Sequence, residues 1–314
     1  MKVAVVGAGI MGAATAWRLA QRGADVVVHE QFGPDHDRGS SHGRTRIFRV
    51  AYPDPDWVRF AQEAYAGWKE LDADVLRLYG LVEIARSPEL TSARALEECG
   101  LPCRFLEPEE MRIPDGWSAL FVPDAGVTLA DGARHAFLEG IDVRYDSRVD
   151  DLEALDADVV VVTAGSWIGR FFPDLPLKVT RETVAYFRHA GPPPPSIVEL
   201  DEHSAHAFFS LHDPVHGLKA GAHHAGAEAD PDEPGEADPA LVQRIGSWVA
   251  ERLPAADPEP ILAETCLYTT TPDERFILER RGRLVIGSAC SGHGFKFAPA
   301  VGARLAALAL GTDN

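Results

Sequence analysis

The chain has 314 residues, of which 46% are hydrophobic and 25% charged, a composition typical of a globular protein that excludes disorder, collagen and coiled coil as descriptions of the whole chain. Asp and Glu outnumber Lys and Arg by 48 to 30, and the resulting net charge of −18 argues against nucleic acid as a partner. No apolar run reaches the roughly 18 residues of a membrane helix and the start does not resemble a signal peptide, so we expect a cytoplasmic protein that does not enter a membrane.

The first thirty residues predict a βαβ unit. Residues 2–6 read as an apolar strand, and residues 13–23 as a helix with apolar side chains at helical spacing. Residues 25–30 read as a second buried strand that ends in an acidic residue. This order of elements is typical of the first half of a nucleotide-binding domain.

The loop between the first strand and the helix has the Gly-x-Gly-x-x-Gly pattern of dinucleotide-binding proteins. Gly7 permits a tight turn, Gly9 lets the backbone approach a pyrophosphate, and Gly12 lets the helix pack close to the strand. Met11 lies in the same loop, where N–H groups at the helix N-terminus face the phosphates. Glu30 can accept hydrogen bonds from an adenosine ribose. These residues predict a bound dinucleotide, and they leave open whether it is NAD or FAD.

The later segments alternate between two kinds of sequence pattern. Apolar strands and amphipathic helices predict a doubly wound α/β core, whereas the segments between them mix short strands, prolines and histidines. Exposed loops are expected at 191–195 and, with acidic composition, at 226–238. Further core strands are expected at 141–145, 158–163 and 283–287, and helices at 54–71 and 298–310. The nucleotide-binding domain then comprises 1–80, 127–172 and 266–314, and the inserted domain 81–126 and 173–265.

The cysteines predict neither a disulfide scaffold nor a metal site. The chain has four cysteines, which are too few for a disulfide framework in a chain of this length: Cys99, Cys103, Cys266 and Cys290. Cys99 and Cys103 are close in sequence but have no second pair of ligands nearby, so we expect no zinc.

Three further stretches decide between NAD and FAD. Residues 39–52 read GSSHGRTRIFRVAY, residues 266–274 read CLYTTTPDE and residues 291–297 read SGHGFKF. Together with the glycine loop they closely resemble the monomeric sarcosine oxidase family of FAD-dependent amine oxidases, which includes N-methyltryptophan oxidase and pipecolate oxidases. The resemblance runs from the first strand to the last helix of a chain that is shorter than usual for the family. It implies a Rossmann-like FAD-binding domain of the glutathione-reductase type with an inserted mixed-sheet substrate domain.

The stretch 39–52 suits a flavin site. Ser40 and Ser41 are small hydroxyl donors for the pyrophosphate and ribityl chain. Arg46 and Arg49 are three residues apart, so both can face one site if they lie on a helical turn. By resemblance, Arg46 lies beside the flavin ring and Arg49 binds the substrate carboxylate, a task that suits a planar guanidinium. The resemblance also assigns cofactor contacts to His42, which flanks the flavin, and to Thr45.

The same resemblance gives roles to residues far along the chain. Lys296 is the second cation on the substrate carboxylate, and the backbone at Gly292 and Gly294 approaches the flavin. Two cations aimed at one point are costly unless an anion lies between them, which favours an amino acid over a simple amine as substrate. Cys266 corresponds to the cysteine that forms a thioether to the flavin 8-methyl group, and a thiolate is a suitable nucleophile for that bond.

Lys219 corresponds to the family's oxygen-activating lysine near flavin N5. A cation there stabilises the negative charge that develops on dioxygen. His223 corresponds to a histidine of the substrate pocket. One departure is the absence of the tyrosine that sarcosine-using members carry shortly before the lysine, because this chain has Phe208 and Phe209 there. The more apolar pocket favours a bulkier or cyclic secondary amino acid over sarcosine.

The sequence therefore predicts a monomeric FAD-dependent oxidase that converts a secondary or cyclic α-amino acid to an imine with release of hydrogen peroxide. These residues do not determine which carbon is oxidised. The alternatives are a flavin dehydrogenase that uses another electron acceptor, an NAD(P)-dependent dehydrogenase, and a flavin-binding protein without turnover.

Overall fold

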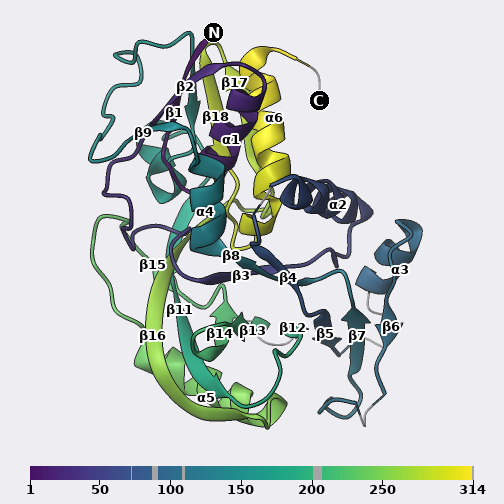
Figure 1. Ribbon diagram of the computed structural model, residues 1–314. Helices are drawn as coiled ribbons and strands as arrows, with labels where there is room; N and C mark the ends of the chain where they lie inside the picture. Colours follow the sequence, from purple (N-terminus) through teal and green to yellow (C-terminus); the bar gives the residue numbers. More distant parts are fainter. Residues whose placement is uncertain (72, 87–90, 108–109, 201–206, 313–314) are drawn as a thin grey trace.

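The computed structural model describes residues 1–71, 73–86, 91–107, 110–200 and 207–312. Two large sheets lie at opposite ends of the molecule, one beside helices α1 and α6 and the other beside α5, with a small third sheet between them (Figure 1). The mixed α/β fold predicted from the sequence is confirmed. Among the residues described, no helix is long and apolar enough to cross a membrane.

The first sheet has six strands in the order β17-β18-β10-β1-β2-β9, and only the β17–β18 pair is antiparallel within the described chain. The strand order reverses between β1 and β10, whose carboxyl ends meet where Gly7 follows β1 and Thr163 follows β10. Open α/β sheets bind ligands at such a point. The strands are β1 (Lys2–Val6), β2 (Asp25–His29), β9 (Asp142–Arg144), β10 (Val159–Val162), β17 (Ile277–Arg281) and β18 (Leu284–Ser288).

Helix α1 (Ile10–Gln21) begins three residues earlier than the sequence predicts. Gly9 is its N-cap, so the helix starts inside the glycine loop, and Gly23 ends the turn that follows it with φ +77°. Helices α2 (Pro55–Glu70) and α6 (Ala298–Leu310) agree with the predicted bounds to within one residue.

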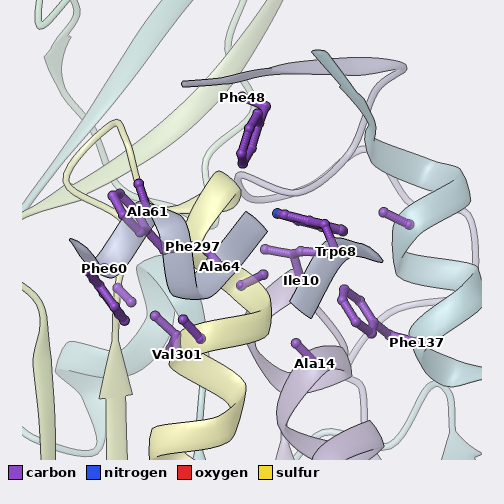
Figure 2. Close-up of a cluster of buried hydrophobic side chains, with 14 of the residues drawn as sticks. Ile10, Ala14, Phe48, Phe60, Ala61, Ala64, Trp68, Phe137, Phe297 and Val301 are labelled. Atoms are coloured by element: carbon purple, nitrogen blue, oxygen red, sulfur yellow. The ribbon is translucent and has the colours of Figure 1, made fainter. Parts of the chain in front are cut away.

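Figure 2 shows the buried core that these helices share. The ring of Phe60 on α2 stacks on Phe297, with ring centroids 4.9 Å apart and an angle of 15° between the ring planes. Trp68, about two turns further along α2, donates its indole N–H to the backbone carbonyl of Lys296 at 2.8 Å. The short 3-10 turn η2 (Phe295–Phe297) is therefore fixed on α2, and this contact holds Lys296 in place.

The second sheet has nine strands, of which eight follow the order β15-β11-β14-β13-β12-β5-β7-β6, and the ninth, β16, pairs antiparallel with β11 along its whole length, Lys178–His189. Helix α5 (Pro239–Arg252) covers one face through Ile245, Trp248 and Val249, which pack on Leu218 and other apolar residues of the sheet. The strands are β5 (Leu81–Ala85), β6 (Arg104–Phe105), β7 (Ser118–Val122), β11 (Lys178–His189), β12 (Ser196–Leu200), β13 (Ala207–Asp213), β14 (Gly217–His223), β15 (Ala227–Glu228) and β16 (Ala256–Thr270).

The third sheet corrects one prediction. Its strands are β3 (Thr45–Phe48), β8 (Gly126–Leu129) and β4 (Leu76–Leu78). The prediction that Arg46 and Arg49 lie on a helical turn is wrong, because residues 45–48 are extended and pair antiparallel with β8. Helices α3 (Thr91–Glu98), α4 (Ala130–Leu138) and α5 were not predicted from the sequence. The domain division stays a prediction, although its boundary between residues 265 and 266 falls inside β16.

Candidate active site

A single long cavity joins the first sheet to the second. At one end it begins at the carboxyl ends of β1 and β10, and at the other it reaches the face of the second sheet opposite α5. All but one of the site residues expected from the sequence line it, and Gly12 lies just behind the loop. The lining residues among them are Gly7, Gly9, Met11, Glu30, Ser40, Ser41, His42, Thr45, Arg46, Arg49, Lys219, His223, Cys266, Gly292, Gly294 and Lys296.

The glycine loop is shaped for close backbone packing. Gly7 has φ +101°, and a Cβ on it would lie 2.6 Å from the carbonyl oxygen of Thr163. A Cβ on Gly12 would lie 1.9 Å from the carbonyl oxygen of Gly7, so no larger residue fits at either position. Gly9 caps α1 without a side-chain hydrogen bond, and the first turn carries no acidic residue. The positive end of the helix dipole therefore faces the cavity with no acidic side chain in the first turn, which suits a pyrophosphate.

Glu30 and the two serines brace this loop. The Glu30 carboxylate is buried and accepts hydrogen bonds from the backbone N–H of Ala8 at 2.8 Å and of Phe32 at 3.1 Å. Ser41 accepts the N–H of Ile10 at 3.0 Å. Ser40, expected as a donor to the cofactor, donates its hydroxyl to a backbone carbonyl of β16 instead. Contacts of these three side chains with FAD stay predictions.

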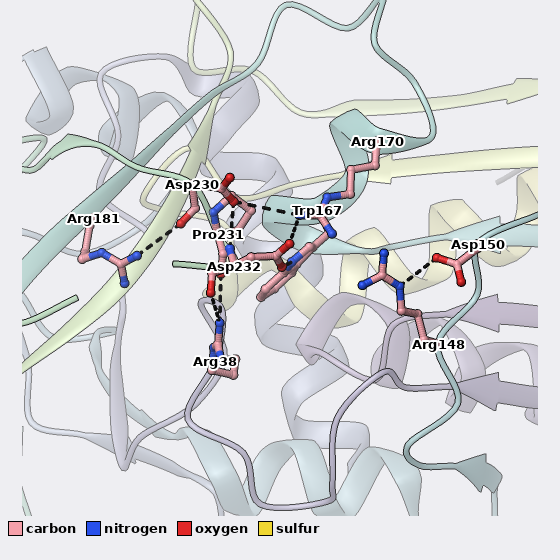
Figure 3. Close-up of polar contacts among 9 residues, drawn as sticks. All are labelled: Arg38, Arg148, Asp150, Trp167, Arg170, Arg181, Asp230, Pro231 and Asp232. Atoms are coloured by element: carbon pink, nitrogen blue, oxygen red, sulfur yellow. Dashed lines mark hydrogen bonds and ion pairs between the residues drawn. The ribbon is translucent and has the colours of Figure 1, made fainter. Parts of the chain in front are cut away.

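The segment that the sequence marks as an exposed acidic loop is tied down beside this end of the cavity (Figure 3). Asp232 accepts the indole N–H of Trp167 at 2.7 Å and pairs with Arg170. Arg38 donates to the carbonyl of Asp232 at 2.9 Å, and Arg181 of β11 donates to that of Glu233 at 2.6 Å. Sequence reasoning missed Trp167, Arg38 and Arg170 as cavity-lining residues, because their partners lie far away in the chain.

Arg46 and Arg49 both line the cavity although they are not on a helix. Arg46 donates to the carbonyls of Thr45, Ser40 and His42 at 2.7–2.8 Å, which fixes the guanidinium beside the glycine-rich segment. Arg49 follows the end of β3, donates to the carbonyl of Ala51 at 2.5 Å, and lies 4.1 Å above the ring of Tyr52.

Lys296 lies close to Arg49. Its side chain is only 5% exposed, and its ammonium donates to the carbonyl of His293 at 2.6 Å and lies 5.9 Å from the centre of the Tyr52 ring. Burial, and next the charge of Arg49, hold the pKa of Lys296 well below its usual range. Within the described chain, neither cation forms an ion pair with a carboxylate. An anionic ligand would offset the cost of burying both.

Histidine and tyrosine side chains close the space around these cations. His223, at the end of β14, lies with its Nδ1 3.3 Å from the hydroxyl of Tyr268. A Cβ on Gly292, where φ is +70°, would lie 2.5 Å from each of those rings. Burial, followed by the charge of His224, keeps the pKa of His223 well below its usual range, so the imidazole is neutral. Sequence reasoning gave Tyr268 no role, yet strand alternation places it on the same face as Cys266 two residues earlier.

Lys219 lies on β14 and Cys266 on β16, and both of these strands pair with β11 in the second sheet. Burial, and next the charge of Arg46, lower the pKa of Lys219 to about 7. Burial raises the pKa of the Cys266 thiol, and the charges of Arg46 and Lys219 oppose that rise. Burial together with the same two charges lowers the pKa of His42 to about 4.

Two buried polar atoms at this part of the cavity fit a polar ligand. Nε2 of His42 and Oγ1 of Thr45 have no hydrogen-bond partner among the residues described. The cavity lining also includes the apolar side chain of Phe209, whose ring lies against Gly221. Phe208 also contributes to the lining and stacks on Trp248 of α5. The cavity thus combines a glycine cradle, unpartnered polar atoms, buried cations and an apolar wall.

Known proteins are similar to this chain in sequence along nearly its whole length. The sequence profile of the FAD dependent oxidoreductase family matches residues 2–308. Peroxisomal sarcosine oxidase of Homo sapiens is 32% identical over 358 residues, covering 98% of this chain and 91% of its own length. Monomeric sarcosine oxidase of Bacillus sp. (strain B-0618) is 29% identical, with 98% and 92% covered. N-methyl-L-tryptophan oxidase of Yersinia pestis (strain Pestoides F) is 27% identical, with 95% and 92% covered.

Solved structures agree on the fold. NikD, an unusual amino acid oxidase essential for nikkomycin biosynthesis, superposes with a TM-score of 0.84 at 23% identity over 98% of this chain and 93% of its own. L-proline dehydrogenase from P. horikoshii superposes with a TM-score of 0.83 at 18% identity over 100% and 94%. The family match decides the cofactor in favour of FAD over NAD(P). The chain belongs to the family of FAD-dependent oxidoreductases and is sarcosine oxidase-like within it.

Proposed function

We propose that this protein is an oxidase of a secondary or cyclic α-amino acid, which it converts to an imine with release of hydrogen peroxide. The observation that carries the proposal is the pair Arg49 and Lys296, two cations that line the cavity without a carboxylate partner in the part of the chain that the structure describes. An α-carboxylate supplies the missing negative charge, whereas a simple amine supplies none. The names of the sarcosine and N-methyl-L-tryptophan oxidases among the relatives support the same substrate class.

The chain's own residues bind and orient the substrate in this proposal. FAD, when bound, supplies the redox chemistry by accepting two electrons from the amine and passing them to dioxygen. Arg49 and Lys296 bind the carboxylate, and the guanidinium gives that contact its direction. His223 and Tyr268 bound the space for the amine, while Phe209 offers an apolar surface to the substrate side chain. Fixing both ends of the substrate orients the bond to be oxidised.

The glycine loop and the segment after β2 would hold the cofactor. Gly7, Gly9 and the first turn of α1 suit the pyrophosphate, and Glu30 lies where the ribose is expected. His42 and Thr45 offer unpartnered polar atoms further along the same cavity.

Lys219 is proposed to serve the reduction of dioxygen. A buried cation stabilises negative charge that develops on oxygen, because it acts in surroundings from which water is excluded. An enzyme that passes its electrons to another acceptor has no use for such a charge. Lys219 therefore favours an oxidase over a dehydrogenase.

Cys266 is proposed to bind the flavin covalently through a thioether, in which an S–C bond replaces the Cys266 S–H and one C–H of the flavin 8-methyl group and dioxygen takes up the two electrons released. Its position in the cavity, with Arg46 and Lys219 near enough to oppose the rise in its pKa, supports this role because thiolate is the reactive form. The test is acid precipitation of the purified protein. Yellow colour should stay with the pellet and the protein mass should exceed that of the chain by one FAD, and Cys266→Ala should release the colour. Free FAD from the unaltered protein would contradict the proposal.

The function itself is tested by a peroxide-release screen over N-methyl and cyclic α-amino acids, with anaerobic bleaching of the flavin recorded in parallel. We expect bleaching and peroxide from the same compounds. Bleaching without peroxide in air would identify a dehydrogenase instead. Equal turnover of the corresponding amines without carboxylates would contradict the role given to Arg49 and Lys296.

The oligomeric state and the compartment stay predictions. The name of the monomeric sarcosine oxidases supports a monomer. Size-exclusion chromatography with light scattering tests that expectation.

A further inference from the structure

A group of buried polar side chains lies beside the cavity and has no role in the proposed reaction so far. Tyr186 on β11 and Asp213 at the end of β13 are fully buried, and Glu264 lies on β16. All three are on the cavity face of the second sheet. Tyr186 pairs in register with Lys219, and Glu264 lies one diagonal step from Tyr186 on the neighbouring strand.

Tyr186 connects Glu264 to Lys219. Its hydroxyl donates to Oε2 of Glu264 at 2.7 Å, and its ring centre lies 5.5 Å from the ammonium of Lys219. Burial raises the pKa of Tyr186 above its usual value, so the hydroxyl keeps its proton and remains a donor. A cation within about 6 Å of an aromatic ring is attracted by the negative face of the ring. The hydrogen bond to a carboxylate fixes the ring and adds to its electron density.

Charged and titratable groups approach Lys219 from several elements. Arg46 of β3 disfavours the cation, while Glu264 and Cys266 of β16 and Asp213 of β13 favour it. His42, which precedes β3, is held neutral by burial and by these cations. Within the described ranges Lys219 forms no ion pair with a carboxylate, and Tyr186 lies between its ammonium and Glu264.

We propose that Tyr186 and Glu264 are positioning residues for Lys219: the ring of Tyr186 holds the ammonium at the cavity wall, and Glu264 holds the ring while its charge keeps the ammonium protonated. The inference rests on the proposed function, because it takes Lys219 to act on dioxygen. The competing view is that the Tyr186–Glu264 hydrogen bond only joins β11 to β16.

The test compares the two half-reactions of the holoenzyme by stopped-flow spectroscopy in Tyr186→Leu, Tyr186→Phe and Glu264→Gln. We expect Tyr186→Leu to slow flavin reoxidation roughly 2- to 30-fold, the range that corresponds to a cation–π contact. Tyr186→Phe and Glu264→Gln should cause smaller losses that are not additive in the double variant. Anaerobic reduction by substrate should change less than about twofold in all of them, because Lys219 is not part of the carboxylate site.

A matched control is Glu199→Gln. It removes a buried ion pair with Arg252 in the same sheet, on the face toward α5. We expect it to lower thermal stability and to leave the ratio of the two half-reactions unchanged. If Tyr186→Leu does not fold, Glu264→Gln decides the question.

A second measurement reads the charge of Lys219 directly. The chain has only five lysines, so holoenzyme with 13C-labelled lysine should give a resolvable Lys219 signal that is absent from Lys219→Met. In Glu264→Gln this signal should titrate at lower pH than in the unaltered enzyme, because a nearby negative charge is gone.

The outcomes separate the two proposals. If Lys219→Met slows reoxidation but the Tyr186 and Glu264 variants do not, the positioning inference is wrong and the proposed function stands. Equal losses in both half-reactions for these variants would also overturn the inference in favour of a structural role. If Lys219→Met itself leaves reoxidation unchanged, the oxygen role proposed for Lys219 is wrong, and the inference fails with it.

Discussion

Lys219 and Lys296 are both almost fully buried and line the same cavity, yet their surroundings differ. Lys219 is 6% exposed and lies near Tyr186, and the charge of Arg46 acts on it together with Glu264 of β16 and Asp213 of β13. Lys296 is 5% exposed, and its ammonium lies among Arg49, histidines and a backbone carbonyl.

The difference in nearby charge suits the two lysines to different functions. Lys219 has negative charge within the chain, so it can stay protonated beside an uncharged molecule such as dioxygen. Each lysine has an arginine nearby, Arg46 for Lys219 and Arg49 for Lys296, but no carboxylate acts on Lys296 among the residues described, so Lys296 is stable as a cation only when an anion binds. Depth of burial is the same in both cases, and the neighbours decide what each lysine can do.

The largest effect that distinguishes them is expected from Lys219→Met. Methionine fills a similar volume without charge, so flavin reoxidation should fall by orders of magnitude while anaerobic reduction changes little. Rapid mixing of substrate-reduced enzyme with dissolved oxygen measures the first step, and anaerobic mixing with substrate measures the second. Equal losses in both steps would mean that Lys219 shapes the whole site.

The reverse pattern is expected from Lys296→Met. Losing one charged hydrogen bond to the substrate carboxylate should weaken binding about ten- to a hundredfold, and reoxidation should stay the same. Arg49→Lys should also weaken binding, since an ammonium cannot make the two parallel contacts of a guanidinium. Lys178→Met, at the exposed start of β11, is the control and should change neither step. Unchanged binding in Lys296→Met would show that its charge does not meet the substrate.

The parts of the fold that follow from short-range pattern could be predicted. Strands β1, β2, β9, β10 and β18 of the first sheet and helices α2 and α6 lie within one residue of the expected bounds, because their apolar runs and periodicity are visible in consecutive residues, whereas β17 was not predicted. The helical turn at Arg46 and Arg49 was wrong, since β3 is extended by pairing with β8, some eighty residues later. Helix α5 follows an acidic loop, and its N-cap Asp238 was included in that loop.

For the site, resemblance brought together residues that pattern alone could not connect. The structure places Arg49, Lys219 and Lys296 on one cavity although they come from three separate parts of the chain. The partners of Lys219 were not predicted, because a single tyrosine and a single glutamate have no sequence pattern that marks them as functional. Tyr186 and Glu264 acquire meaning only through the register of β11 with β14 and β16.

A smaller effect should appear in the pH dependence of the unaltered enzyme. Burial lowers the pKa of Lys219 to about 7, so the ammonium loses its proton as the pH rises through that value. The rate of reoxidation should therefore be highest on the acidic side and decline through neutral pH, and Lys219→Met should abolish the decline. A rate that rises with pH across the same range would contradict a protonated Lys219 as the active form.

The smallest effect is expected from Tyr52→Phe, the counterpart of Tyr186→Phe. Tyr52 lies under Arg49 and near Lys296, and its hydroxyl lies 3.4 Å from Nδ1 of His293. Burial raises the pKa of Tyr52 to about 12, so the phenol is neutral and does not replace the missing anion.

Removing that hydroxyl keeps the aromatic ring and breaks one long contact, so substrate binding should weaken less than about threefold. Tyr52→Leu removes the ring as well and should weaken binding more, toward the range of a lost cation–π contact. Anaerobic titration of flavin absorbance with a carboxylate inhibitor measures both. A loss of binding in Tyr52→Phe as large as that in Lys296→Met would mean that the Tyr52 hydroxyl itself contacts the ligand. The difference between Tyr186, whose hydroxyl is bound to a carboxylate, and Tyr52, whose hydroxyl is not, would then no longer explain the difference between the two lysines.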